Sequence, residues 1–169
     1  RQHSTILQRL CVEPGGFALA TCHRAENTDD PHRLESILTA LAEIAGQIPV
    51  ILPLHPRTHK LVRDYGLSDW LSGLRVTEPL PFLDMVALEQ AAQVILTDSG
   101  GVQKEAFFYR VPCITLRDET EWVETIRLGW NRLAGSGKDE ILAAYRGLQA
   151  PAGEPAQPYG SGDAAKRIV

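Results

Sequence analysis

The sequence lacks a long apolar run and any segment of the secretory kind. No stretch approaches the roughly 20 apolar residues that a membrane-spanning helix needs, and no charged and then apolar segment stands at the beginning of the chain. We therefore expect no contact with a membrane, and the cytoplasm is the default expectation for the location of the protein.

Positive charge is also scarce. The 17 lysines and arginines are outnumbered by 21 aspartates and glutamates, which gives a formal net charge of -4. A nucleic-acid-binding protein needs a basic stripe to neutralise many phosphates, so this class is excluded. An anionic ligand would have to be met by a few local donors.

Cysteine is rare and unpaired in pattern. The three cysteines, Cys11, Cys22 and Cys113, are odd in number and form no CxxC pair, which argues against a disulfide framework and against a zinc site. We expect all three to be buried reduced thiols. No set of His, Cys, Asp and Glu residues has metal-ligand spacing, so no metal site is expected.

What is present is the pattern of one globular α/β domain. Of the 169 residues, 44% are hydrophobic and 22% are charged, and apolar segments typical of strands alternate with segments of helical periodicity. The expected strands are residues 17–21, 49–54, 74–76, 94–97, 113–116 and 131–134. The expected helices are residues 4–10, 31–45, 58–65, 83–92, 105–109, 140–148 and 163–169. This alternation predicts a Rossmann-like parallel sheet with helices on both faces.

Two helices carry recognisable start signals, and one change of composition marks a boundary. Asp29 or Asp30 precedes Pro31 as an N-cap, and Ser136 precedes Asp139 by three residues, close to a capping box. From residue 149 the chain turns rich in Pro, Gly and Ala. We therefore expect a domain over residues 1–148, followed by a surface connection and the start of a terminal helix over residues 149–169.

Polar residues of interest follow the expected strands. They are His23, His55, Phe82, Ser99 and Arg117. Ligands of open parallel sheets bind outside the carboxyl ends of the strands, so we expect these residues to share one edge of the molecule. Either histidine is a structural residue, a cation near a phosphate, a neutral donor or a general acid. Phe82 stacks on a base or fills the core, and Trp122 and Trp130 are expected in the core or at a domain contact.

The segment from Thr97 to Glu105, with the sequence TDSGGVQKE, is central among these. Glycines where a strand gives way to a helix let the backbone approach a phosphate, but the same residues also suit a plain turn capped by Asp98 or Ser99. Arg117 has the fork geometry to grip a phosphate or ribose, or pairs with Asp118, Glu119 or Glu121. Glu105 accepts bonds from ribose hydroxyls or is a solvated helix residue.

Hydrolysis by Ser99 is set aside. The letters DSGG also surround the nucleophile of chymotrypsin-like proteases, but those enzymes are double β-barrels, whereas Ser99 lies between a buried strand and a helix. The GxSxG elbow is absent because Thr97 replaces its first glycine, and no histidine follows Ser99.

Five segments together resemble the UDP-N-acetylglucosamine 2-epimerase family in order and spacing. They are TCHRAEN (21–27), LHP (54–56), TDSGGVQKE (97–105), LRDETE (116–121) and PYG (158–160). The resemblance covers the second half of an enzyme with two Rossmann-like domains in the GT-B arrangement. It implies inversion at C2 of UDP-GlcNAc to UDP-ManNAc, through elimination and re-addition of UDP, without a cofactor.

Site roles follow from the resemblance by motif. Ser99, Gly100 and Gly101 are expected to hold the diphosphate and Glu105 the ribose. Arg117, Phe82 and His23 line the nucleotide site, and His23 is the one catalytic residue assigned to this chain. Further contacts, to an allosteric UDP-GlcNAc, fall on Arg24, Glu26 and His55.

The resemblance also implies what the 169 residues do alone. The carboxylates that move the proton at C2 belong to the family's N-terminal domain, so we expect this chain to bind UDP and UDP-N-acetylhexosamine but not to turn them over. The full-length enzyme is expected to form a homodimer.

Two departures from the family pattern concern the sugar. Lys104 stands where many members have Glu, and Glu121-Trp122-Val123-Glu124 replaces Glu-Arg-Pro-Glu, a variation that resembles epimerases of UDP-2,3-diacetamido-glucuronate. A GT-B glycosyltransferase and a stand-alone binding module remain alternative functions.

Overall fold

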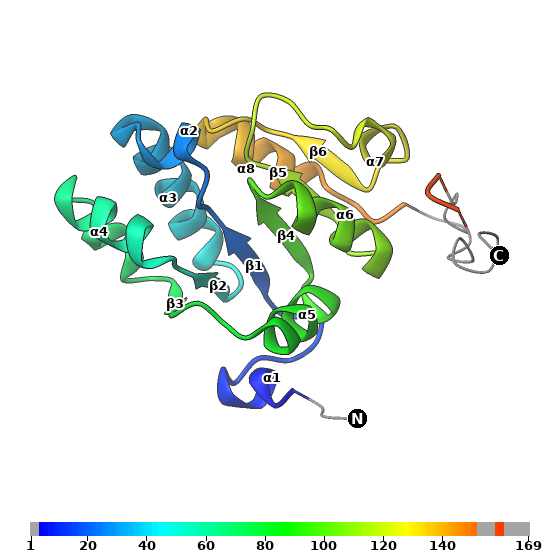
Figure 1. The fold of residues 1–169 in the computed structure, drawn as a ribbon, viewed down its shortest axis with the longest axis horizontal. Helices are drawn as coiled ribbons and strands as arrows, with labels where there is room; N and C mark the ends of the chain where they lie inside the picture. Colours follow the sequence, from blue (N-terminus) through cyan, green and yellow to red (C-terminus); the bar gives the residue numbers. More distant parts are fainter. Residues whose placement is uncertain (1–3, 152–157, 161–169) are drawn as a thin grey trace, which may run out of the picture.

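The protein is built around one parallel sheet covered by helices on both faces (Figure 1). A computed structural model describes residues 4–151 and 158–160. The six strands run in the order β3-β2-β1-β4-β5-β6, all parallel. Their bounds are β1 Ala18–Thr21, β2 Val50–Pro53, β3 Arg75–Thr77, β4 Val94–Thr97, β5 Cys113–Thr115 and β6 Asn131–Leu133. The predicted Rossmann-like class is confirmed.

Helices lie between successive strands, and in addition α1 precedes β1 and α8 follows β6. Their bounds are α1 Ile6–Arg9, α2 Ala25–Thr28, α3 Pro31–Ala45, α4 Pro56–Asp64, α5 Phe82–Ala91, α6 Gly100–Tyr109, α7 Val123–Arg127 and α8 Lys138–Gly147, with a 3-10 helix at Ser68–Leu71. Asp30 caps α3 by accepting from the N–H groups of His32 and Arg33 at 2.9 and 3.2 Å. Of the two aspartates proposed for this cap, the second is the one that serves.

Alternate residues of each central strand enter separate cores, since successive side chains of a strand point to opposite faces. In β1, Ala18 and Ala20 join a cluster formed with α3, α4 and α8, whereas Leu19 joins a cluster formed with α1, α5 and α6. The strands β2 and β4 divide their side chains in the same way. Burial on both faces explains why these strands are uniformly apolar in sequence.

The order of the strands reverses between β1 and β4. From β1 the chain moves to β2 and β3 on one side, and from β4 it moves to β5 and β6 on the other. Crossovers on the two sides diverge at such a switch point, which opens a crevice at the carboxyl ends of the strands. The segments after β1 and β4 are therefore the ones that can line a ligand site.

Several local predictions differ from the structure. The helix expected over residues 105–109 begins at Gly100 with Ser99 as its N-cap. The Ser136 cap is wrong, because α8 has Gly137 at its N-cap, without a side-chain capping bond. Burial of all three cysteines is also wrong, since Cys11 is exposed. The short helices α2 and α7 were not expected, and the helical fragment expected over residues 163–169 lies outside the described residues.

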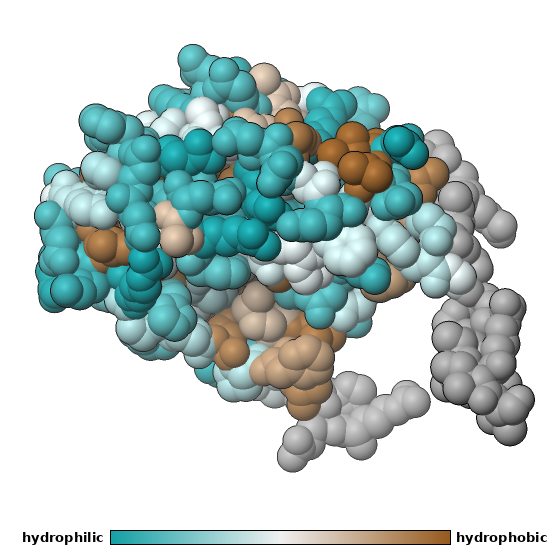
Figure 2. All heavy atoms as spheres, turned by 45° about the horizontal axis from the view of Figure 1, so that its top comes forward, coloured by the Kyte–Doolittle hydropathy of each residue, from teal (hydrophilic) through white to brown (hydrophobic). Residues whose placement is uncertain are grey.

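The face of the described part that Figure 2 shows is mainly hydrophilic. Figure 2 shows hydrophobic side chains in separate small patches between polar ones. The large hydrophobic side chains that are exposed are Trp70, Val76, Phe82, Leu83, Phe108, Val123 and Leu133. None of the helices in residues 4–151 combines the length and apolar character needed to cross a membrane.

Candidate functional site

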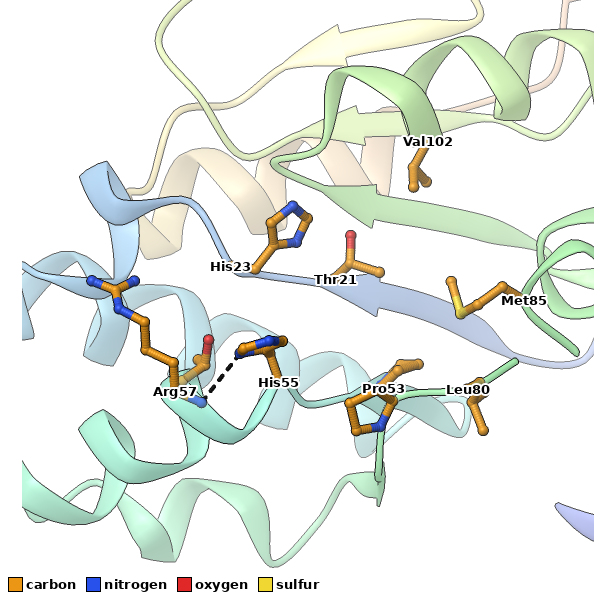
Figure 3. A pocket seen from close by; sticks show the side chains of 10 residues that line it. Thr21, His23, Pro53, His55, Arg57, Leu80, Met85 and Val102 are labelled. Atoms are coloured by element: carbon orange, nitrogen blue, oxygen red, sulfur yellow. Dashed lines mark hydrogen bonds between the residues drawn. The ribbon is translucent and has the colours of Figure 1, made fainter. Parts of the chain in front are cut away.

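A cavity of about 430 Å³ lies at the carboxyl edge of the sheet, beside the switch point. It is lined by Thr21, His23, Pro53, His55, Arg57, Thr58, Pro79, Leu80, Met85 and Val102. Figure 3 shows polar side chains from the ends of β1 and β2 on one side and Met85 and Val102, from α5 and α6, on another. The cavity therefore combines polar and apolar walls, as sites for amphipathic small molecules do.

The buried carboxylate of Asp98 ties three strand ends together. It is fully buried and accepts the backbone N–H groups of His23 and Arg24 at 3.0 and 2.9 Å. Asn27 donates its amide both to Asp98, at 3.3 Å, and to the Leu116 carbonyl, at 2.8 Å. A carboxylate satisfied in this way is stabilised despite burial. The loops after β1, β4 and β5 are thereby held in one arrangement.

The two histidines of the cavity are oriented differently. The Nδ1 atom of His23 lies 3.5 Å from Asp98 Oδ1, which favours a proton on that nitrogen and leaves Nε2 as the outward atom. The Nδ1 atom of His55 instead accepts the backbone N–H of Arg57 at 3.2 Å, so the neutral ring carries its proton on Nε2 (Figure 3). In its neutral form, His23 thus presents an acceptor where His55 presents a donor.

The glycine turn, Ser99 to Gly101, forms the start of α6. The Ser99 hydroxyl accepts the Val102 N–H at 3.4 Å, and Thr97 accepts the Ser99 N–H at 2.9 Å. The first N–H groups of a helix have no partner within the helix, and the dipole is positive there. Because glycine has no side chain, the backbone of Gly100 and Gly101 can be approached closely.

Arg117 belongs to a cluster of charged side chains that reaches the turn through Glu121. Its side chain is 5% exposed and donates to both carboxylate oxygens of Glu121, at 3.0 and 2.9 Å, while its Nε lies 3.5 Å from Glu26 Oε1. The hydrogen bonds from Arg117 lower the pKa of the Glu121 carboxyl. Arg24 reaches the other side of Glu121 at 4.0 Å. The ion pair with Glu121, one of the alternatives drawn from the sequence, is thus formed.

A carboxyl pair continues the site between α5 and α6. Glu89 follows Met85 by one helical turn, and Glu105 follows Val102 in the same way, so each shares a helix face with a residue of the cavity. Glu89 is 3% exposed, and its Oε2 finds no hydrogen-bond partner in the described part of the chain. Burial, and then the charge of Glu105, raise the pKa of Glu89 to about 7.

The structure brings most of the expected site residues together, but not Phe82. His23 and His55 line the cavity, the glycine turn adjoins Arg24 and Glu121, and Glu26 contacts Arg117. Phe82 is 72% exposed and is not among the lining residues, whereas Met85, one turn further along α5, is. Met85 was missed because helical spacing does not distinguish it from its neighbours on α5, and Leu80 was missed because it stands in the connection before that helix. Among residues 4–151 and 158–160, no cluster of His, Cys, Asp and Glu could hold a metal ion.

Comparison with known proteins identifies a family over the whole chain. A family model described as UDP-N-acetylglucosamine 2-epimerase matches residues 1–169. The chain belongs to this family. The resemblance seen in the five sequence segments is therefore confirmed over the whole chain.

Two relatives and one solved structure indicate the range of the family. The UDP-2,3-diacetamido-2,3-dideoxy-D-glucuronate 2-epimerase of Pseudomonas aeruginosa is 50% identical over 156 residues, covering 91% of this chain and 43% of that protein. A UDP-N-acetylglucosamine 2-epimerase homolog of Methanococcus maripaludis is 44% identical, covering 100% and 48%. The UDP-GlcNAc 2-epimerase of Methanocaldococcus jannaschii, solved with UDP-GlcNAc and UDP, matches with a TM-score of 0.86 and 36% identity, covering 99% and 48%.

The chain spans a little under half the length of these relatives. Solved epimerases of the family have the GT-B arrangement of two Rossmann-like domains, and this chain matches the C-terminal one. The expected fold class is confirmed at this level too.

Replacing Asp98 by Asn should destabilise the fold. In Asp98→Asn one of the two carboxylate oxygens becomes an amide NH₂, and since the His23 N–H donates to both oxygens, it would face a donor in place of one acceptor. Leaving such buried donors unsatisfied costs about 1 to 3 kcal/mol. The matched control is Asp118→Asn. The Asp118 side chain is 73% exposed, and its ion pair with Arg33 should contribute less than about 1 kcal/mol. Equal losses in urea unfolding would contradict the role of Asp98.

Stability should also depend on the proton of Glu89. The folded protein holds this proton up to a pH of about 7, against 4.5 for the unperturbed group. The resulting stabilisation is complete below that lower value and is lost as the pH rises through the upper one. Between about pH 5.5 and about pH 8.5 we expect a loss on the order of 2 kcal/mol in unfolding free energy, nearly all of it below about pH 7.5.

The variant Glu89→Gln should remove this loss, because the amide does not ionise, whereas Glu35→Gln, at an exposed position of α3, should retain it. The measurement is urea unfolding at several pH values. An unchanged pH profile in Glu89→Gln would show that another group is responsible.

Proposed function

We propose that this chain is the UDP-binding domain of a UDP-sugar 2-epimerase. The observation that carries the proposal is the cavity at the switch point, which adjoins a glycine turn at the start of a ten-residue helix. A nucleoside diphosphate needs an apolar wall for its base and a cluster of donors for its phosphates. Both occur here within one family whose relatives act on UDP-sugars.

The diphosphate is assigned to the glycine turn. The N–H groups of Gly100 and Gly101 and the positive end of the α6 dipole favour an anion. Arg24 adds a local cation, since its Nη2 lies 3.9 Å from the position that a Cβ on Gly100 would take. Arg117 is assigned to the same site, where its charge offsets that of Glu121. These few donors fit a chain whose overall charge is negative.

The nucleoside is assigned to the wall formed by α5 and α6. Leu80, Met85 and Val102 offer an apolar surface to the base, and a polarizable thioether packs well against a ring. Glu105, one turn beyond Val102, is assigned to the ribose hydroxyls, which a carboxylate accepts as a pair. In this arrangement Met85 takes the role that was predicted for Phe82.

His23 is assigned the catalytic role in this domain. Epimerisation by elimination and re-addition breaks the bond between the anomeric carbon and the UDP oxygen, so negative charge grows on the departing diphosphate. A protonated His23, oriented by Asp98, would stabilise that charge in the transition state. The carboxylates that remove the C2 proton are assigned to the other half of the enzyme, so the chain alone should bind UDP without turnover.

The sugar is assigned by class only. The relative at 50% identity is an epimerase of UDP-2,3-diacetamido-glucuronate, and several more distant relatives are UDP-GlcNAc 2-epimerases. A 2-acetamido group next to the anomeric carbon is common to both sugars. We therefore propose a UDP-2-acetamido sugar as substrate of the full-length enzyme, with His55, Arg24 and Glu26 available to a second, regulatory nucleotide-sugar.

Single substitutions in the site should each weaken the affinity for UDP. The measurement is calorimetry of UDP with the chain and with Ser99→Ala and Arg117→Ala. Loss of one charge-assisted bond costs about 1.5 to 3 kcal/mol, which is roughly one to two decades in affinity. The controls Ser72→Ala and Arg63→Ala remove the same side chains from exposed positions and should leave the affinity unchanged. Unchanged affinity in both site variants would overturn the assignment.

The reaction itself should be tested on the full-length enzyme. Incubation with UDP-GlcNAc and with UDP-2,3-diacetamido-glucuronate should yield the 2-epimer of one of them, detected by NMR. Free UDP together with a glycosylated acceptor would instead identify a glycosyltransferase. Turnover by the 169 residues alone would contradict the division of roles between the two halves.

A further inference from the structure

A cluster of aromatic side chains surrounds Lys104 beside the glycine turn. The Lys104 Nζ lies 4.3 Å from the ring centre of Trp122, 4.7 Å from that of Tyr159 and 5.9 Å from that of Phe108. These distances are within the range of cation–π attraction. Tyr159 in turn meets Trp122 edge to face, with ring centres 5.9 Å apart and planes at 90°. The indole of Trp122 is therefore in contact with both Lys104 and Tyr159.

Trp122 is also bonded directly to the glycine turn. Its Nε1–H donates to the carbonyl of Gly100 at 2.7 Å. The loop that carries it is fastened to α6 at a second point, since Thr120 donates to Gln103 Oε1 at 2.6 Å and accepts the Trp122 N–H at 3.1 Å. The segment after β5 is thus hydrogen-bonded to the first turn of α6 at two residues, Gly100 and Gln103.

This bond has a consequence for the opposite side of the peptide. The Gly100 carbonyl and the Gly101 N–H belong to one planar trans peptide and point in opposite directions. Both glycines stand in the first turn of α6, where glycine holds the helical backbone less firmly than other residues do. A donor that fixes the carbonyl therefore also fixes the direction of the Gly101 N–H, without touching what that N–H binds.

We propose that Trp122 is a positioning residue for the diphosphate, because its indole N–H, steadied by Lys104 and Tyr159, aims the Gly101 N–H at the phosphates. The inference rests on the proposed function and deepens it. Tyr159 joins the segment 158–160 to the loop that carries Trp122. It contacts the Trp122 ring edge to face and donates a hydrogen bond to Glu124 at 3.4 Å. Packing of that segment thereby supports the phosphate site.

The test compares ligands that differ in phosphate. Trp122→Phe keeps an aromatic ring over Lys104 and removes the N–H donor. We expect its affinity for UDP to fall about tenfold, the effect of one lost hydrogen bond, while its affinity for uridine changes less than about twofold. Calorimetry with UDP and uridine gives both values. Trp70→Phe makes the same substitution at an exposed position in the 3-10 helix and should change neither.

Lys104→Met provides a second variant in case Trp122→Phe fails to fold. It removes the cation that steadies the indole and leaves the N–H in place, so it should weaken UDP in the same direction by a smaller factor. Tryptophan fluorescence provides a further measurement. Addition of UDP should change the fluorescence of the wild type and of Trp70→Phe but not that of Trp122→Phe.

The outcomes separate this inference from the proposed function. Equal losses for UDP and uridine would show that Trp122 merely supports the fold, and no loss for UDP would show that the turn is fixed without it; either result overturns the inference alone. A wild-type chain that binds no UDP overturns the proposed function and the inference with it.

Discussion

The buried carboxylate of Asp98 is the interaction on which the site depends. It stands at the end of β4, yet it accepts backbone N–H groups from the segment after β1, and through Asn27 it reaches the end of β5. A fully buried charge is tolerated only when it is well hydrogen-bonded. The need to satisfy Asp98 therefore fixes the β1 segment, and that segment carries His23 and Arg24 into the site.

The charges around the glycine turn must also be balanced. Glu121 brings a negative charge close to a turn that we assign to phosphate, and Arg117 and Arg24 offset it. Trp122, the next residue, bonds the turn on its outer side. A single short loop after β5 thus supplies both the charge balance and the fastening of α6. Because two arginines offset the charge of Glu121 locally, a chain of net negative charge can still offer an anion site.

Much of this could be predicted from local sequence. The glycines after an apolar strand predicted the turn, and residues two positions beyond β1, β2, β4 and β5 proved to lie at one edge. Other features depended on neighbours distant in the chain. Met85 and Phe82 look equally suitable in sequence, but α5 turns only Met85 toward the cavity. Burial of Glu89 beside Glu105 and the contact of Trp122 with Gly100 also join separate segments.

By itself the sequence determined the alternation of strands and helices, the parallel sheet and the family, because strand burial, helix periodicity and short motifs are local properties of the chain. Only the tertiary structure decided which polar groups are satisfied by one another. It paired Arg117 with Glu121, oriented His23 by Asp98 and exposed Cys11, Phe82 and Gly101. Such pairings at the site depend on distances between residues as many as 89 positions apart, which the packing of the two cores sets.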